Sequence, residues 1–570
     1  MAPAPGGAGR AGPLVVTGAA VVALLLVTVL IGARGVAAMR TTSDFLVASR
    51  QTSPMLNAAA VSGEYLSAAS FLGVAGLVIK EGTGALWYPV GFTAGYLLML
   101  ALVAAPMRRS GALTVPGFAE ARLGSRSLRR FCAVVVVVIA VLYLVPQIVA
   151  AGQLLTLVSG VDYWVGVVVS GLAVGITLAL GGMRAATYVQ AFQFALKLLL
   201  FAGPAIWLLL LAGPQLRDEL AAPPEFTHFT RETPVDFRLD TDLVVTEPVT
   251  VAVDGIPVEL TPGTHHARAD QVWLFPEGAP VPGLGGDRAS LPVPGGEDWA
   301  LPLLGTGATA PLLATWSVLV ATALGTMGLP HIIVRFHTSP DGRGARRTAA
   351  ITVALLGTFY LFTIVYGLLG TVLTPELYLS QGTDTAIVTL PGRVTGGGTA
   401  AVLTSLLTAG AFAAFLATSL GLLLALSGAL SHDLMPSGLR RLRLTALAAS
   451  AAVVPAALLM VRVDVSAAVT SAFTVAASTF CPLLVLGLWW KGLTARGAYA
   501  GMVAGLVCSA GAMGLGATLG LGGTAGILLT QPALWSVPLS FVLMIAVSLG
   551  DHVPSWAEDT MLRLHLADRE

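Results

Sequence analysis

Residues 400–430 read AAVLTSLLTAGAFAAFLATSLGLLLALSGAL, and this stretch contains no charged side chain. It is longer than the roughly 20 apolar residues that a helix needs to span a bilayer. Because backbone groups in lipid must be satisfied within the segment, such a run is predicted to be a transmembrane helix. Comparable runs occur at 14–32, 55–79, 85–105, 131–158, 164–180, 187–212, 308–332, 348–373, 442–461, 466–490, 497–518 and 532–549. The sequence therefore predicts an all-α integral membrane protein with about 13 transmembrane helices.

The composition of the 570 residues supports this class. Mean hydropathy is +0.83, and charged residues make up 11%, against roughly 25% in soluble domains. The chain has no Walker loop, no HExxH and no dinucleotide-binding glycine motif. No nucleophile–base pair or metal cluster is evident either, so we expect a protein that is not an enzyme. A signal peptide is the alternative for 14–32, but only Arg10 precedes that run, and we expect a retained span.

Basic residues indicate the orientation of the chain. With the N-terminus outside, the inside loops are 33–54, 106–130, 181–186, 333–347, 431–443, 490–497 and the tail from 550. These loops hold 21 of the 31 basic residues, and Arg335 is counted in the 333–347 loop. Positive charge gathers on the cytoplasmic side of membrane proteins. The sequence predicts a plasma-membrane protein with its N-terminus outside and its C-terminus in the cytoplasm.

The outside loop 213–303 differs from the others. It holds 15 acidic and 5 basic residues, and its middle alternates apolar and polar residues. Turn signals at Asp254-Gly255 and Pro262-Gly263 predict a small extracellular β-rich insert. It is either a cap that collects substrate or binds a partner, or a solvated loop without a role in transport.

Ionisable groups inside a membrane are costly and are functional candidates. Glu64 lies in the run 55–79, which Gly63, Gly73 and Gly76 interrupt. Glycines allow a helix to open so that its carbonyls face a cavity, which favours an ion or substrate site. Close helix packing through small residues is the alternative for the glycines, but it leaves Glu64 unexplained.

Lys197 is the other charged residue deep in a span. It shares one helix face with Gln190 and Gln193, at spacing i, i+3, i+7. It is either a gate or coupling residue, with pairing to Glu64 conceivable, or a lysine that extends its ammonium group to the interface.

Two further segments carry candidate groups. Pro330 and His331 follow glycines near the end of the run 308–332, which indicates a second discontinuous helix. Both residues are gate or coupling candidates. His331 is a gate or proton-sensitive group, or a solvated histidine at a helix end. Thr418 and Ser419 offer hydroxyl oxygens for a small cation, although a hydroxyl in a helix often bonds back to its own backbone.

Several motifs together resemble the sodium/solute symporter family, and within it the cation–acetate (monocarboxylate) branch. They are SGEYLSAASFLG (62–73), GTMGLPHIIVRF (325–336) and SHDL (431–434), with YLVPQ (143–147) and GGM (181–183) in addition. The resemblance covers roughly residues 40–215 and 305–500, with the motifs in the same order along the chain.

The resemblance implies a core of two inverted five-helix repeats, an inverted 5+5 (LeuT-like) arrangement. The repeats are then 55–212 and 308–490, with the insert 213–303 between them. One extra helix (14–32) precedes the core, while two (497–549) and a cytoplasmic tail (550–570) follow it. The insert is a departure from the short members of the family.

The resemblance also implies the sites. Sodium is the coupling ion, and no cofactor is expected. Its ligands are the carbonyls of Ala58, Val61 and Ala414 with the hydroxyls of Thr418 and Ser419. Counted back from Asp433, the family's hydroxyl pair falls on Ala417 and Thr418, so Ser419 would replace one hydroxyl. The residues that line the substrate cavity by resemblance are Ser62, Glu64, Tyr65 and Gln147.

The sequence thus predicts a secondary active transporter that takes up sodium with a small monocarboxylate such as acetate, propionate or pyruvate. We expect no nucleic acid and no obligate protein partner. The alternatives are sodium- or proton-coupled symport of another solute, such as proline or a sugar, and a transporter-like sensor module. The short segment after the last span speaks against a sensor, because sensors carry long signalling domains.

Overall fold

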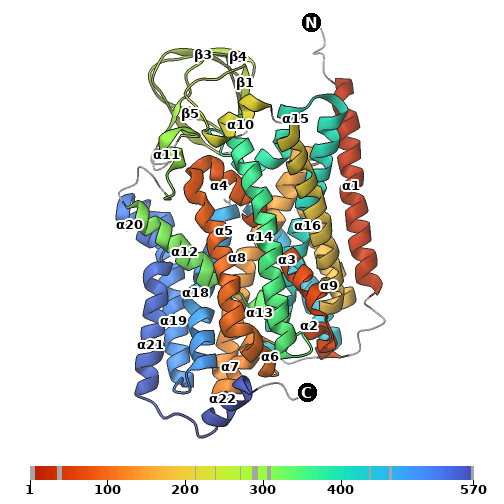
Figure 1. Ribbon diagram of the computed structural model, residues 1–570, viewed down its shortest axis with the longest axis vertical. Coiled ribbons are helices and arrows are strands. Elements are labelled where there is room, and N and C mark those ends of the chain that lie inside the picture. Colours follow the sequence, from red (N-terminus) through yellow and green to blue (C-terminus); the bar gives the residue numbers. More distant parts are fainter. Residues whose placement is uncertain are drawn as a thin grey trace.

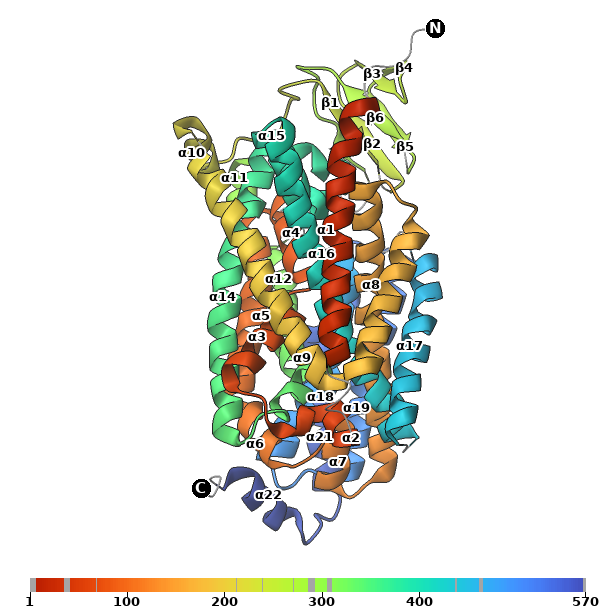
Figure 2. The same ribbon diagram turned by 90° about the vertical axis from the view of Figure 1, so that its right-hand side faces the viewer.

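The computed structural model describes residues 7–34, 41–67, 69–211, 213–237, 239–269, 271–285, 293–304, 310–435, 438–460 and 465–566. Long helices stand side by side along the longest axis of the molecule, and all the strands gather at one end (Figure 1). The same arrangement is visible after a quarter turn (Figure 2). The molecule is therefore a helical bundle with a β-rich cap at one end.

In the part of the chain that the structure describes, fifteen helices and helix segments follow the predicted apolar runs. They are α1 (Gly7–Arg34), α3 (Pro54–Tyr65), α4 (Val74–Glu81), α5 (Trp87–Leu98), α6 (Ala104–Arg109), α8 (Arg126–Ser159), α9 (Tyr163–Leu211), α12 (Pro311–Gly328), α13 (Pro330–Phe336), α14 (Gly342–Leu373), α16 (Gly397–Gly428), α17 (Leu439–Leu459), α18 (Val465–Trp489), α19 (Ala495–Leu519) and α21 (Ala533–Leu549). The helices outside these runs are α2 (Thr42–Val47), α7 (Val115–Leu123), α10 (Pro214–Ala221), α11 (Gly296–Ala300), α15 (Ala386–Val394), α20 (Gly523–Thr530) and α22 (Ala557–His565). Residues 68, 212, 308, 309 and 461 of the predicted runs lie outside the described residues.

Within the described residues, nine helices are long and apolar enough to cross a membrane. The pair α20 and α21, bent by 54°, makes ten if it is one span. This number is smaller than thirteen partly because neighbouring predicted runs form one continuous helix. The runs 164–180 and 187–212 both lie in α9, which is kinked at Gly182 (φ 53°, ψ −148°). Residue 182 is a glycine because L side chains rarely adopt a positive φ.

Two helices of the core are broken. The first break follows α3, where Leu66 and Ser67 leave the helix before a π-helical turn (Ala69–Gly73) leads into α4. The second break is a single extended residue, Leu329 (φ −69°, ψ 114°), between α12 and α13. Pro330 at the first position of α13 causes it, because proline forces the preceding residue out of the helical region. The discontinuous helices predicted at 55–79 and 308–332 are both present.

The cap is built from two antiparallel sheets. A four-stranded sheet has the order β1 (Thr233–Asp236), β6 (Val272–Phe275), β3 (Val249–Val253), β4 (Ile256–Leu260), and a three-stranded sheet has the order β5 (Gly263–Ala267), β2 (Thr241–Val245), β7 (Gly283–Leu284). The hairpin predicted at Asp254-Gly255 joins β3 to β4, and both turn residues have positive φ. This is the pattern of a two-residue turn that matches the twist of the strands.

The segment 296–301, which follows the β-rich cap in the chain, binds the bundle. The indole of Trp299 on α11 donates a hydrogen bond of 2.9 Å to the carbonyl of Val78 on α4. Thr83 donates to the carbonyls of Ala300 and Leu301. The segment that leaves the cap therefore touches α4, the second part of the first broken helix, and the turn that follows it.

Candidate functional site

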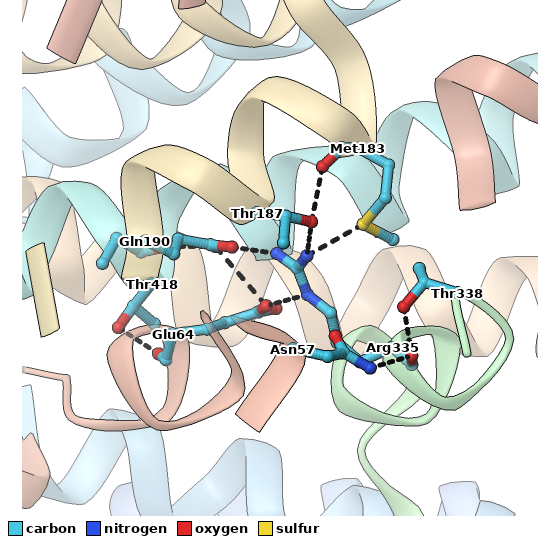
Figure 3. Close-up of polar contacts among 9 residues, drawn as sticks. Asn57, Glu64, Met183, Thr187, Gln190, Arg335, Thr338 and Thr418 are labelled. Carbon is cyan, nitrogen blue, oxygen red and sulfur yellow. Dashed lines mark hydrogen bonds and ion pairs between the residues drawn. The ribbon is translucent and has the colours of Figure 1, made fainter. Parts of the chain in front are cut away.

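A buried ion pair joins the two broken helices. The carboxylate of Glu64, at the end of α3, accepts a hydrogen bond of 2.6 Å from Nε of Arg335 on α13 (Figure 3). Both side chains are almost fully buried, with exposures of 0% and 1%. Charges in such a place are tolerated only when they are paired. Glu64 therefore holds α13 against the end of α3.

The guanidinium of Arg335 also binds α9. It donates to Oγ1 of Thr187 and to Sδ of Met183, each at 2.9 Å, and to Oε1 of Gln190 (Figure 3). The backbone carbonyl of Arg335 accepts from Nδ2 of Asn57 at 2.9 Å. One side chain thus connects α3, α9 and α13.

The assignment of Arg335 to the cytoplasmic loop 333–347 is wrong. The structure buries the whole of α13, including Arg335. The apolar neighbours Ile332, Ile333, Val334 and Phe336 were the available signal, because a solvated loop does not require them. A buried Glu64 also requires a cationic partner.

Lys197 does not reach an interface. Its side chain is fully buried, and its ammonium donates to the carbonyls of Gly63 (2.6 Å) and Leu66 (3.0 Å). Glu64 pairs with Arg335 rather than with Lys197. Two glutamines share the face of α9 with Lys197, as predicted. Gln190 donates to the carbonyl of Ala417 at 2.7 Å, and Gln193 to Oγ1 of Thr28 at 3.2 Å.

Glycines let these helices approach closely. A Cβ on Gly63 would lie 2.3 Å from the carbonyl oxygen of Gln190. A Cβ on Gly421 of α16 would lie 1.7 Å from Oε1 of Glu64. The interpretation that the glycines allow close helix packing is therefore correct for Gly63. The same close packing brings the polar side chains of Glu64 and Gln190 together.

The predicted sodium ligands lie on two helices that touch. Ala58 and Val61 on α3, and Ala414, Thr418 and Ser419 on α16, are fully buried. Thr418 donates to the carbonyl of Glu64 at 2.5 Å rather than to its own helix. Ser419 Oγ has no hydrogen-bond partner within the described part of the chain. Both hydroxyl oxygens thus keep lone pairs for a cation, and the ligand set stays a prediction.

Three of the predicted substrate residues, Ser62, Glu64 and Tyr65, lie at the end of α3 beside the first break, and Gln147 lies on α8. Ser62 and Gln147 are buried, and Oγ of Ser62 has no hydrogen-bond partner among the described residues. The hydroxyl of Tyr65 lies 2.8 Å from Oγ1 of Thr326 on α12. Tyr143, which sequence reasoning did not select, donates to Oγ of Ser67 at 3.1 Å. Its place in the motif YLVPQ was the only signal.

His331 lies two residues beyond Leu329, the second break. It is 3% exposed, so the interpretation as a solvated histidine is wrong. Its ring lies edge-on to Tyr143, with centroids 5.6 Å apart. Neither ring nitrogen has a hydrogen-bond partner among the residues that the structure describes. A gate role for Pro330 and His331 stays a prediction.

The segment that follows α13 is bound by a side chain of α6. Nε and one terminal nitrogen of Arg108 donate to the carbonyls of Ser339 and Pro340, each at 2.5 Å. Burial, and then the charges of Arg50 and Arg108, lower the pKa of His337 to about 3. His337 is therefore neutral at pH 7.

The motif SHDL has a structural role. Asp433 accepts hydrogen bonds from Oγ1 of Thr114 (2.9 Å) and Nε of Arg129 (3.0 Å). Arg129 also pairs with Glu120 at 2.8 Å. The motif thus joins the end of α16 to α7 and α8.

No group of three His, Cys, Asp or Glu side chains in the described ranges could hold a metal ion. The predicted sodium ligands are backbone carbonyl and hydroxyl oxygens, which hard cations accept.

Comparisons with known proteins agree with this architecture. The profile described as "Sodium:solute symporter family" matches residues 45–212 and 305–505. A protein of Bacillus subtilis (strain 168) named "Uncharacterized symporter YwcA" is 27% identical over 523 residues, which cover 88% of each chain.

Two solved structures are similar in fold. The first is a sodium-coupled sialic acid symporter in a substrate-bound, outward-open state, with a TM-score of 0.61 and 13% identity over 94% of this chain and 98% of that one. The second is a nucleobase-cation-symport-1 family transporter in a closed conformation, with a TM-score of 0.53 and 11% identity over 91% and 98%. Because the family profile covers more than half of the sequence, the chain belongs to the sodium:solute symporter family.

Proposed function

We propose that the protein couples sodium entry to the uptake of a small monocarboxylate, such as acetate, propionate or pyruvate, by alternating access. As a family member it is a multi-pass, sodium-coupled solute symporter and not an enzyme. The motifs 62–73, 325–336 and 431–434 support the monocarboxylate branch. Sodium supplies the driving force, since one charge that crosses 100 mV releases about 2.3 kcal/mol.

The observation that carries the substrate class is the pairing of Glu64 with Arg335. An unpaired carboxylate at this position would repel an anionic substrate, but Arg335 neutralises it at 2.6 Å. The groups left at the first break are donors: the hydroxyls of Ser67 and Tyr143, and the ammonium of Lys197. The helical segment 69–81 also begins there, and half-helix N-termini in such transporters point at anionic substrate groups.

The substrate is tested by uptake of labelled acetate into proteoliposomes, with sodium replaced by choline as the control. We expect sodium-dependent uptake that unlabelled propionate and pyruvate inhibit, while proline and glucose do not. If proline or glucose inhibits uptake and the monocarboxylates do not, the inhibiting solute is the substrate and the proposal of a monocarboxylate is wrong. Equal uptake in choline with an imposed proton gradient would indicate proton coupling.

The sodium site is tested by substituting both hydroxyl residues, Thr418→Ala with Ser419→Ala. We propose that their oxygens complete the set of carbonyls from Ala58, Val61 and Ala414, so the sodium dependence should move to higher concentration by about tenfold or more. Thr408→Ala is the matched control, because that hydroxyl donates to the carbonyl of Thr404 in the same helix. Unchanged sodium dependence in the double variant would refute the ligand set.

We also propose that the β-rich cap lies outside the cell and α22 in the cytoplasm. The two elements lie at opposite ends of the bundle (Figure 1), and most basic residues fall in the loops assigned to the inside. Thr261 in the cap and Ser555 before α22 are exposed. In intact cells, an impermeant maleimide should label Thr261→Cys but not Ser555→Cys, with the unsubstituted chain as the background. The reverse pattern would invert the orientation.

A further inference from the structure

The end of α3 presents backbone carbonyls inside the membrane. A helix leaves its last four carbonyls without intrahelical partners, and unsatisfied groups are costly in lipid. The last backbone bond of α3 runs from the N–H of Leu66 to the carbonyl of Ser62, so the four carbonyls without a helical partner are those of Gly63 to Leu66. Each of these four carbonyls receives a hydrogen bond from a side chain. Lys197 binds the carbonyls of Gly63 and Leu66, Thr418 binds that of Glu64, and Ser70 binds that of Tyr65 at 3.0 Å. The end of α3 is thus a cluster of oxygen acceptors around an ammonium group.

Such a cluster attracts a cation. The C-terminal end of a helix carries partial negative charge, and broken helices of transporters use these carbonyls to coordinate sodium or protons. The ammonium of Lys197 has three donors and no acceptor, so it can bind only acceptor atoms. Both of its contacts are backbone carbonyl oxygens, which are also ligands for a free cation. Glu64 does not neutralise it through a direct bond, because its carboxylate pairs with Arg335.

We propose that Lys197 is a tethered cation that fills a second monovalent-cation site at the end of α3. The ammonium of Lys197 supplies the positive charge that a bound ion would supply, but it is not transported. The coupling stoichiometry is then one sodium ion, bound by the predicted ligand set of Thr418 and Ser419, for each solute molecule. This proposal rests on the sodium-coupled part of the proposed function, and it does not depend on which solute is carried.

The first experiment counts ions in the unmodified protein. Binding of ²²Na⁺ to the purified full-length chain needs no substrate, so it remains decisive if acetate is not the solute. We expect one sodium ion per chain and a Hill coefficient near one. Two sodium ions per chain would overturn the proposal.

The second experiment removes the tether. In Lys197→Ala, sodium-driven solute uptake should fall about tenfold or more, because buried carbonyls lose their charged donor. Ammonium ions added to the medium should restore uptake, since the space that the lysine leaves can admit them. Tetramethylammonium, which has no N–H donor, should not restore it.

Lys197→Met is the matched control, because its side chain fills the same space without a charge. Ammonium should leave this variant inactive. The proposal fails if Lys197→Ala transports at the normal rate, if ammonium restores both variants equally, or if it restores neither. Binding of ²²Na⁺ at the first site shows that each variant is folded. If Lys197→Ala does not fold, the ion count in the unmodified chain decides alone.

Discussion

The two broken helices reach the same region of the bundle in different ways. The break after α3 is long, and side chains from α9 and α16 bind its carbonyls. The break between α12 and α13 is one residue, Leu329. Its N–H donates to the carbonyl of Thr326 in α12 (3.3 Å), and its carbonyl accepts from the N–H of Ile333 in α13 (3.1 Å). The first break is held by charged and hydroxyl donors from other helices, while the second is made by proline and held by packing.

This difference assigns different tasks to the two breaks. Polar donors at the first break can be exchanged for ions or substrate groups, so this break is suited to binding. At the second break, Gly325 and Gly328 pack against α18, where a Cβ on either would lie 2.5 Å from a backbone oxygen. A tightly packed break without exchangeable ligands is suited to transmitting movement. The Glu64–Arg335 pair and the Tyr65–Thr326 contact connect the two.

The largest effect is expected from removing one member of the ion pair. Arg335→Met leaves the Glu64 carboxylate buried without its partner, which typically costs about 3–5 kcal/mol. The free energy of unfolding, measured by SDS titration in mixed micelles, should fall by this amount. The double variant Glu64→Gln with Arg335→Met should recover most of the loss. If the double variant is as unstable as the single one, the two breaks are not joined through this charge pair.

Close packing is the property that the two breaks share, and glycine substitution tests it. Gly63→Ala places a Cβ 2.3 Å from the carbonyl oxygen of Gln190, and Gly328→Ala places one 2.5 Å from that of Ala476. Overpacking against backbone typically costs about 1–3 kcal/mol, so both variants should lose stability in the same SDS titration.

The control for these variants is Gly357→Ala on α14, because nothing lies within 4 Å of the position that a Cβ would take there. It should be neutral or slightly stabilising, since alanine favours helix more than glycine by about 1 kcal/mol. A tolerated Gly328→Ala beside a damaging Gly63→Ala would show that only the first break requires close approach.

A smaller effect is expected at the contact between the breaks. The hydroxyls of Tyr65 and Thr326 lie 2.8 Å apart and are buried. Tyr65→Phe or Thr326→Val leaves one hydroxyl without a partner, and each should cost about 1–3 kcal/mol. The double variant should cost less than the sum of the two. Strict additivity would mean that the hydroxyls do not interact.

Much of this architecture is predictable from the sequence, because apolar length and helix-breaking residues act locally. The spans, the two breaks and the hairpin at Asp254-Gly255 follow from such local signals. Counting charges did not identify Arg335 as a buried residue, because this method treats an arginine near the end of a span as solvated. Its burial depends on Glu64, 271 positions away. The carbonyl contacts of Lys197 were equally hidden, since they require the three-dimensional pairing of α9 with α3.

The smallest effect on stability is expected at His331, and it provides the sharpest contrast with Lys197. Both are buried, but Lys197 binds two carbonyls, while neither ring nitrogen of His331 has a partner among the described residues. Replacing an unpartnered polar group by an apolar one is close to neutral. His331→Leu should therefore change the free energy of unfolding by less than about 1 kcal/mol, whereas Lys197→Leu should cost more. A large loss in His331→Leu would mean that the second break also depends on polar contacts, and the division between a binding break and a packing break would then fail.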